Sequence, residues 1–253
     1  MFLKPPKIHF MIKSAATLTL LFIFIATWSQ ETKERVRPKL EASASISINS
    51  NGIAYVPAFS LGKPAIIGTL SLVRGRFSYD PQLSYSLELR PWIIDNWFHY
   101  KIIDRPSFEF KAGTVISSFF SEVETEDGVI WQAQKYLAVE FISKYKFTPN
   151  SSLSFTYLLD RGQDQGTTHG HFFNLQAERS EISLGEKGFL SATLQGFYIN
   201  YTGNEDGLFV AGNISASVRQ VPFFIFFQAI QAITSNIDPF PPFKWNVGLA
   251  YTL

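Results

Sequence analysis

Apolar and polar residues alternate along the last ten residues of the chain, Lys244 to Leu253. The apolar positions are Trp245, Val247, Leu249, Tyr251 and Leu253. A period of two predicts a β-strand with one apolar and one polar face. An unpaired strand edge is a template for unwanted association, so we expect this strand to close a sheet by pairing on both sides.

The same alternation recurs in segments of about ten residues, with less regular strands between them. We predict about twelve strands, each bounded to within about two to four residues. Their ranges are Leu40–Asn49, Ile67–Tyr79, Gln82–Arg90, Trp97–Ile103, Ser107–Ser117, Lys135–Phe147, Ser152–Asp160, Phe172–Leu184, Phe189–Tyr201, Leu208–Arg219, Pro222–Ile233 and Lys244–Leu253.

Short and long connections are predicted to alternate between these strands. The short set is Asp80-Pro81, Asp104–Pro106, Thr148–Asn150, Gly185–Gly188 and Gln220–Pro222. The longer set is Ser50–Ile66, Pro91–Asn96, Ser118–Gln134, Arg161–Gly170, Gly203–Asp206 and Thr234–Phe243. Such alternation is typical of a transmembrane barrel with short periplasmic turns and longer extracellular loops, and it places both termini in the periplasm.

The chain resembles Gram-negative outer-membrane β-barrels in three features: its C-terminal strand, the alternation of short and long connections, and the aromatic residues near the ends of its strands. The resemblance implies an all-β fold, a transmembrane antiparallel up-and-down barrel of about twelve strands over 40–253, located in the cell outer membrane. It implies contact with outer-membrane lipid and lipopolysaccharide, and recognition of the C-terminal strand by the barrel-assembly machinery. The family usually ends in an aromatic residue, whereas this chain ends in Leu253. A soluble, secreted barrel is the alternative.

The N-terminal segment is predicted to be a signal peptide, residues 1–29. Lys4, Lys7 and Lys13 precede a short apolar run, and Thr27 and Ser29 suit cleavage before residue 30. An uncleaved anchor is the alternative, although the run is shorter than the ~20 residues that span a bilayer. Residues 30–39 are charged and aperiodic, which indicates a short periplasmic tail.

Composition narrows the possible functions. A formal net charge of +1 argues against nucleic acid as a partner. Without cysteine there is no disulfide or thiolate metal site, and four histidines offer little for a metal centre. We therefore expect no metal and no cofactor.

Charged residues fall on the predicted polar face of the strands, which would line the lumen. Both signs are present, so the lumen is either a hydrated pore or is blocked by ion pairs. The lumen-lining candidates are Glu88, Arg90, Lys101, Glu109, Lys111, Glu140, Lys144, Asp160, Glu178 and Arg219.

The third long connection, Ser118–Gln134, is acidic. General porins, which the chain resembles in strand pattern and loop alternation, narrow their pore with an acidic third loop that folds inward. The corresponding constriction candidates here are Glu122, Glu124, Glu126 and Asp127. The alternative is a solvated acidic loop bridged to lipopolysaccharide by divalent ions.

The predicted function is passive diffusion of small polar solutes through a mixed-charge lumen. A non-conducting structural or adhesion barrel is the first alternative, and a surface lipid hydrolase is the second. The hydrolase would use His169 and His171, but the chain lacks a histidine two residues before a Ser-Asn pair, the phospholipase signature. We therefore expect no enzymatic activity.

Overall fold

The computed structural model describes residues 38–54, 59–125, 128–165, 167, 169–203, 205–237 and 243–253. Twelve strands are present within these residues. They are β1 (Leu40–Asn49), β2 (Ala65–Arg74), β3 (Phe77–Ser86), β4 (Pro91–Asp104), β5 (Phe108–Thr125), β6 (Gly128–Thr148), β7 (Ser151–Gly162), β8 (His169–Leu184), β9 (Gly188–Tyr201), β10 (Asp206–Val218), β11 (Phe223–Ser235) and β12 (Phe243–Thr252). The predicted signal peptide and residues 30–37 of the predicted tail lie outside the described residues.

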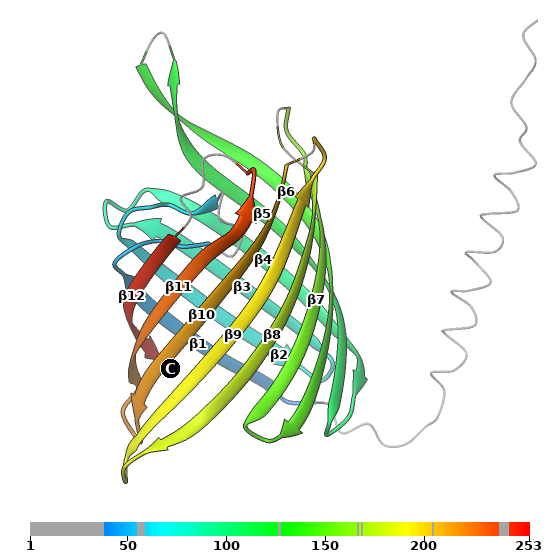
Figure 1. Cartoon of the computed structure of the whole chain (residues 1–253), viewed down its shortest axis with the longest axis vertical. Coiled ribbons are helices and arrows are strands. Elements are labelled where there is room, and N and C mark those ends of the chain that lie inside the picture. The colour runs from blue at the N-terminus through cyan, green and yellow to red at the C-terminus, as the bar shows by residue number, and fades with distance from the viewer. Residues whose placement is uncertain are drawn as a thin grey trace, which may run out of the picture. The chain divides into compact units, whose positions relative to one another are not determined.

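The strands form one closed antiparallel barrel in which chain neighbours pair and β1 pairs with β12 (Figure 1). We call the end that holds the connections after β1, β3, β5, β7, β9 and β11 the loop end. The opposite end, where β1 begins and β12 ends, is the turn end. The predicted fold class is confirmed.

The seam between β1 and β12 is short, pairing residues 45–49 with residues 248–252. Buried side chains reinforce it at the loop end, where Asn246 Nδ2 donates to Asn49 Oδ1 at 2.9 Å. The backbone N–H of Asn51 donates to Asn246 Oδ1 at 3.1 Å. The C-terminal strand therefore closes the barrel as expected.

Removing Tyr251 to Leu253 should prevent stable closure of the barrel. The truncation deletes two of the five residue pairs of the seam and the bond from Leu253 N to Ala44 O, which is 2.8 Å long. We expect most of the truncated protein to lose the heat-sensitive fast-migrating band of a folded barrel in gel electrophoresis. Leu253→Phe keeps the backbone bonds and should fold normally. Normal folding of the truncated chain would contradict the prediction.

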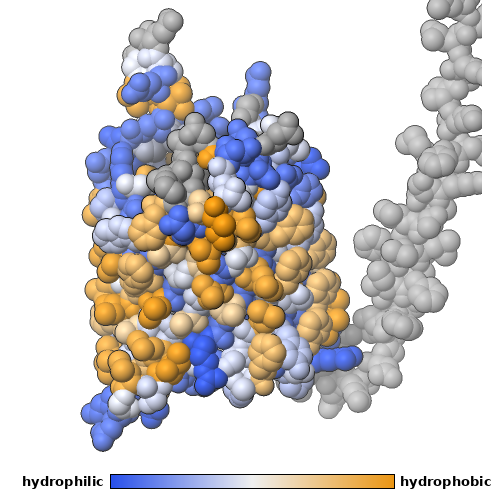
Figure 2. Space-filling model, in the orientation of Figure 1, coloured by the Kyte–Doolittle hydropathy of each residue, from blue (hydrophilic) through white to orange (hydrophobic). Residues whose placement is uncertain are grey.

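The outward face of the barrel is apolar. Ile48, Leu194 and Val247 are 55 %, 61 % and 47 % exposed and lie on three different strands. In Figure 2, apolar residues gather around the middle of the barrel and polar residues gather at its ends. Water would disfavour so much exposed apolar surface, whereas lipid accommodates it. Within the described residues, no helix is long and apolar enough to cross a bilayer.

The first predicted short turn, Asp80-Pro81, is wrong. Both residues lie inside β3 and pair with β4, and the actual turn is Gly75-Arg76, where Gly75 has a φ of 63°. Asp80 suits a strand here because Ser78 Oγ donates to its carboxylate at 2.7 Å. A turn former in the sequence is thus accommodated by side-chain hydrogen bonding.

The second long connection was also misplaced. Pro91–Asn96 belongs to β4, and the connection before it is residues 87–90, where Leu89 has a φ of 60°. Glu88 and Arg90 therefore lie in this connection at the loop end, not on a strand that lines the lumen.

The third long connection is a hairpin, not an inward-folded loop. β5 and β6 stay paired from Ser118↔Lys135 to Thr125↔Gly128, and the hairpin rises above the loop end of the barrel (Figure 1). Cross-strand hydrogen bonding along this hairpin satisfies its backbone donors and acceptors.

Candidate functional site: the barrel lumen

The inward-facing side chains differ in character between the two ends of the barrel. Toward the loop end they include a group of large apolar residues, with a few polar ones such as Asn246 and Asp160 among them, and toward the turn end they are mostly polar or charged. On β10, for example, Phe209 is fully buried, whereas Ser215 and Ser217 occupy inward positions nearer the turn end. The lumen is therefore divided into an apolar part and a polar part.

The connection from β1 to β2 contributes to the apolar part. Its described residues fold together, with Gly52 N donating to Lys63 O at 2.8 Å and Leu61 N donating to Gly52 O at 2.9 Å. Trp92 on β4 is 2 % exposed, and its Nε1 donates to Phe59 O at 2.7 Å. This connection is therefore anchored to the inner wall of the barrel.

Apolar residues of this connection contact two distant parts of the wall. Phe59 packs on Phe119 of β5 and Tyr136 of β6, with ring centroids 4.9 and 5.1 Å apart. Ile53 belongs to a buried cluster on β9 to β11 that includes Phe197. We call the whole arrangement the loop-end plug: Ile53, Phe59, Leu61, Trp92, Phe119, Phe197, Phe209 and Ile230. It is the part of the lumen that sequence reasoning missed.

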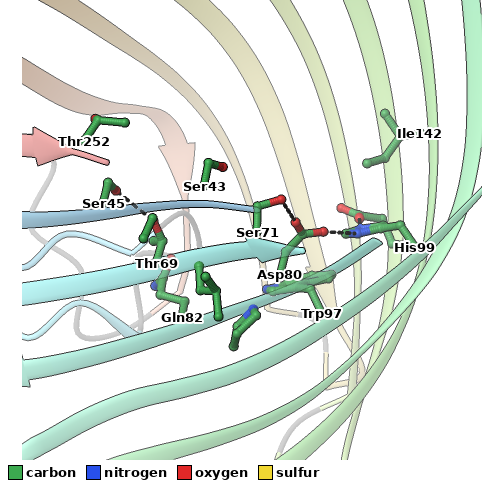
Figure 3. A pocket seen from close by; sticks show the side chains of 14 residues that line it. Ser43, Ser45, Thr69, Ser71, Asp80, Gln82, Trp97, His99, Ile142 and Thr252 are labelled. Carbon is green, nitrogen blue, oxygen red and sulfur yellow. Dashed lines mark hydrogen bonds and ion pairs between the residues drawn. The ribbon is translucent and has the colours of Figure 1, made fainter. Parts of the chain in front are cut away.

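Nearer the turn end, a cavity of about 550 Å³ lies against β1 to β4 and β6. Figure 3 shows hydroxyl, amide, carboxylate and aromatic side chains converging on it. We call this the turn-end cavity. Its principal lining side chains are Ser43, Ser45, Thr69, Ser71, Asp80, Gln82, Trp97, His99 and Glu140.

A polar network crosses the wall of the turn-end cavity. Ser71 Oγ donates to Asp80 Oδ1 at 2.5 Å, and Asp80 Oδ2 lies 3.2 Å from His99 Nδ1. His99 Nε2 lies 2.8 Å from Glu140 Oε2, and Gly113 of β5 separates them in the sheet. A doubly protonated ring can donate to both carboxylates at once. The network thus joins β2, β3, β4 and β6.

Two groups of ion pairs lie at the turn end. Glu109 is 8 % exposed and contacts Lys101 at 3.2 Å and Lys111 at 2.9 Å. Lys144 Nζ donates to Glu178 Oε2 at 2.9 Å. Five predicted lumen residues are thereby brought into two clusters in which the opposite charges compensate one another.

The other predicted residues are dispersed. Asp160 faces inward on β7, and its Oδ1 has no hydrogen-bond partner among the described residues. Arg219 lies in the turn after β10, with its guanidinium 5.1 Å from the ring centre of Phe189. It is therefore at the end of the barrel and not on a spanning strand.

The predicted constriction residues lie on the β5–β6 hairpin or outside the described residues. Glu122 contacts Arg90 at 3.1 Å and Lys63 at 3.8 Å. Glu124 is exposed near the hairpin tip, and Glu126 and Asp127 lie outside the described residues. The contacts of Glu122 join the hairpin to two neighbouring loop-end connections.

His169 and His171 occupy outward positions on β8. Nδ1 of His171 lies 2.9 Å from the hydroxyl oxygen of Tyr157, and the two rings stack with centroids 6.0 Å apart. The described residues contain no group of three or more His, Asp or Glu side chains that could hold a metal ion. The observed partner of His171 is thus an aromatic hydroxyl, which gives no support to a nucleophile-and-base arrangement.

Replacing Glu109 with alanine should destabilise the folded barrel by about 1–3 kcal/mol, because two lysines lose their shared buried carboxylate. Urea unfolding of the vesicle-inserted protein, followed by tryptophan fluorescence, would measure the change. Glu41→Ala removes an exposed carboxylate near the same end and should change stability little. Equal effects of the two substitutions would show that the cluster of Lys101, Glu109 and Lys111 has no special importance.

The closed barrel, its apolar outward face and its partly polar lumen define an outer-membrane β-barrel. No protein-family model matches the sequence, and a search of curated proteins finds no match. The chain is similar in structure to the KdgM porin in complex with disordered oligogalacturonate, with 8 % identity, a TM-score of 0.52, and coverage of 83 % of this chain and 98 % of that chain. It is also similar to an outer-membrane channel from Pseudomonas putida F1, with 9 % identity, a TM-score of 0.50, and coverage of 88 % and 99 %. These similarities establish the fold.

Proposed function

We propose that the protein is a diffusion channel for small polar solutes, narrowed at its loop end by the connection between β1 and β2. The observation that supports this most directly is the turn-end cavity, a space of about 550 Å³ inside a closed barrel whose lining includes hydroxyl, amide and carboxylate side chains. A barrel with only a structural role has no need for such a space. The mixed charges beside it, Lys101, Glu109, Lys111, Lys144 and Glu178, keep the lumen hydrated.

A non-conducting structural or adhesion barrel is the second candidate, and the loop-end plug favours it. Apolar side chains held on both sides of the lumen obstruct the passage of water and ions through this part of the barrel. The two candidates differ in whether this packing opens under working conditions. They agree on the fold and on the membrane location.

Recording in planar lipid bilayers distinguishes the two candidates. For the channel we expect discrete conductance steps from well-folded protein, with both anions and cations carrying current. Swelling of proteoliposomes in small uncharged osmolytes would provide a second measurement that does not depend on ions. Folded protein that gave neither current nor swelling would contradict the channel and support the structural barrel.

A further inference from the structure

We propose that the turn-end cavity is a binding site for a neutral sugar of one or two rings. This inference rests on the proposed channel function, because it names a solute that the lumen would hold in transit. The volume of about 550 Å³ falls within the range of roughly 300–1,000 Å³ that is usual for small-molecule sites. Hydrogen bonding, aromatic surface and charge each point to the same class of ligand.

The hydrogen-bonding groups of the cavity come from neighbouring strands and are spaced along the wall. Ser43 and Ser45 lie on β1, Thr69 on β2 and Gln82 on β3, and Figure 3 shows Ser45 and Thr69 side by side. Their hydroxyls are 2.8 Å apart. Hydroxyl and amide groups both donate and accept hydrogen bonds. They therefore match a ligand with several hydroxyl groups on neighbouring carbons.

An aromatic surface lies beside these groups. The indole of Trp97 is nearly parallel to the imidazole of His99, with an interplanar angle of 3° and centroids 5.7 Å apart. The contacts of His99 with Asp80 and Glu140 hold that imidazole in place, so the stacked indole is also restrained. A sugar ring presents a face of C–H groups that packs against an aromatic ring, while its hydroxyls remain free for hydrogen bonding.

The charge of the cavity disfavours an acidic ligand. Asp80 and Glu140 line it, and the described lining residues include no lysine or arginine. His99 is the basic side chain of this lining, and it lies between those two carboxylates. An anionic sugar would meet like charges in a partly desolvated space, which raises its free energy of binding. A neutral sugar avoids this repulsion.

The test compares D-glucose with D-glucuronate by saturation-transfer NMR on the full chain in detergent micelles. We expect glucose to bind with a Kd of roughly 1–10 mM, an affinity suited to a transported solute. Glucuronate should bind at least about tenfold more weakly because of its charge. Cyclohexanol, which has a similar ring and a single hydroxyl, should show no saturable binding. Equal binding of glucose and glucuronate would overturn the assignment.

Substitutions locate the binding site. Trp97→Ala should weaken glucose binding roughly tenfold, since it removes the aromatic surface. Gln82→Ala should weaken it severalfold and gives a second test if Trp97→Ala does not fold. Trp245→Ala is the matched control, because Trp245 lies on the outward face of β12 and is 50 % exposed. Unchanged binding in folded Trp97→Ala and Gln82→Ala would place the sugar elsewhere and overturn the proposal.

Bilayer recordings of the same preparations separate failure of this inference from failure of the channel. Protein that conducts but binds no glucose would refute the sugar site and leave the channel standing. Saturable glucose binding that is lost in Trp97→Ala would support the site even if the protein carried no current, in which case the proposed channel function would fail alone.

Discussion

Gly113→Val should destabilise the barrel by roughly 3 kcal/mol or more. A Cβ at Gly113 would lie 2.3 Å from His99 Cδ2 and 2.9 Å from the backbone oxygen of Phe98. The imidazole cannot move aside without losing its contacts with Asp80 and Glu140. Urea unfolding in vesicles would measure the stability, and the loss of the heat-sensitive folded band would reveal complete failure to fold.

Two further variants identify the cause of the effect. Gly196→Val is the matched control, because a Cβ at Gly196 meets no atom within 4 Å and a β-branched residue suits a strand. In a His99→Ala background, the part of the cost of Gly113→Val that comes from the imidazole should disappear, giving a coupling free energy of about 1–3 kcal/mol, while the contact with the backbone oxygen of Phe98 remains. If the cost persists in full without His99, the clash with the imidazole is not its source.

Strand number and closure could be predicted because they depend on a local, repeated property. Every second side chain of a membrane-spanning strand faces lipid and is therefore apolar. In segments such as Lys244 to Leu253, the outward-facing residues can be identified from this alternation in the sequence alone. The observed pairing of residues 45–49 with residues 248–252 follows from this alternation together with the need to satisfy both edges of the sheet.

Turn positions were less predictable, since the same residue types serve in turns and strands. Asp80 and Pro81 form part of β3, whereas the turn before it is made by Gly75 between two arginines. Whether an aspartate remains in a strand depends on partners such as Ser71, which precedes it by nine residues. Single-sequence patterns contain no information about that contact.

The sequence prediction missed the loop-end plug because it assumed that each strand has one apolar face, which contacts lipid, and that the face toward the lumen is polar. In the segment from Phe197 to Tyr201, both faces contain large apolar or aromatic residues, and such runs are typical of strands buried on both sides. That signal was available. What the sequence could not show is that Ile53 and Phe59 of a distant connection would supply the packing partners.

The packing of Ile53 and Phe59 in the loop-end plug leads to the largest functional change that we predict. In the double variant Ile53→Asp and Phe59→Asp, the loop end of the lumen should open. Full burial of an apolar side chain contributes about 1.5–3 kcal/mol. Ile53 is buried and Phe59 is partly buried, so two carboxylates in these positions should reverse the preference for the packed arrangement. A shift of this size corresponds to at least a roughly tenfold rise in the open population. Single-channel recording would show it as a higher open probability or a larger conductance step.

Leu89→Asp is the control for this variant, because Leu89 lies at the same end of the barrel but is 73 % exposed. It adds a carboxylate without removing buried apolar area and should leave the recordings unchanged. Since the natural chain has no cysteine, single Ile53→Cys and Leu89→Cys variants give an independent measurement through their rates of thiol modification. The plug protects position 53, so its thiol should react much more slowly than the thiol at position 89. Equal rates, together with unchanged conductance in the double variant, would mean that these side chains do not close the lumen and that solutes are limited elsewhere along it.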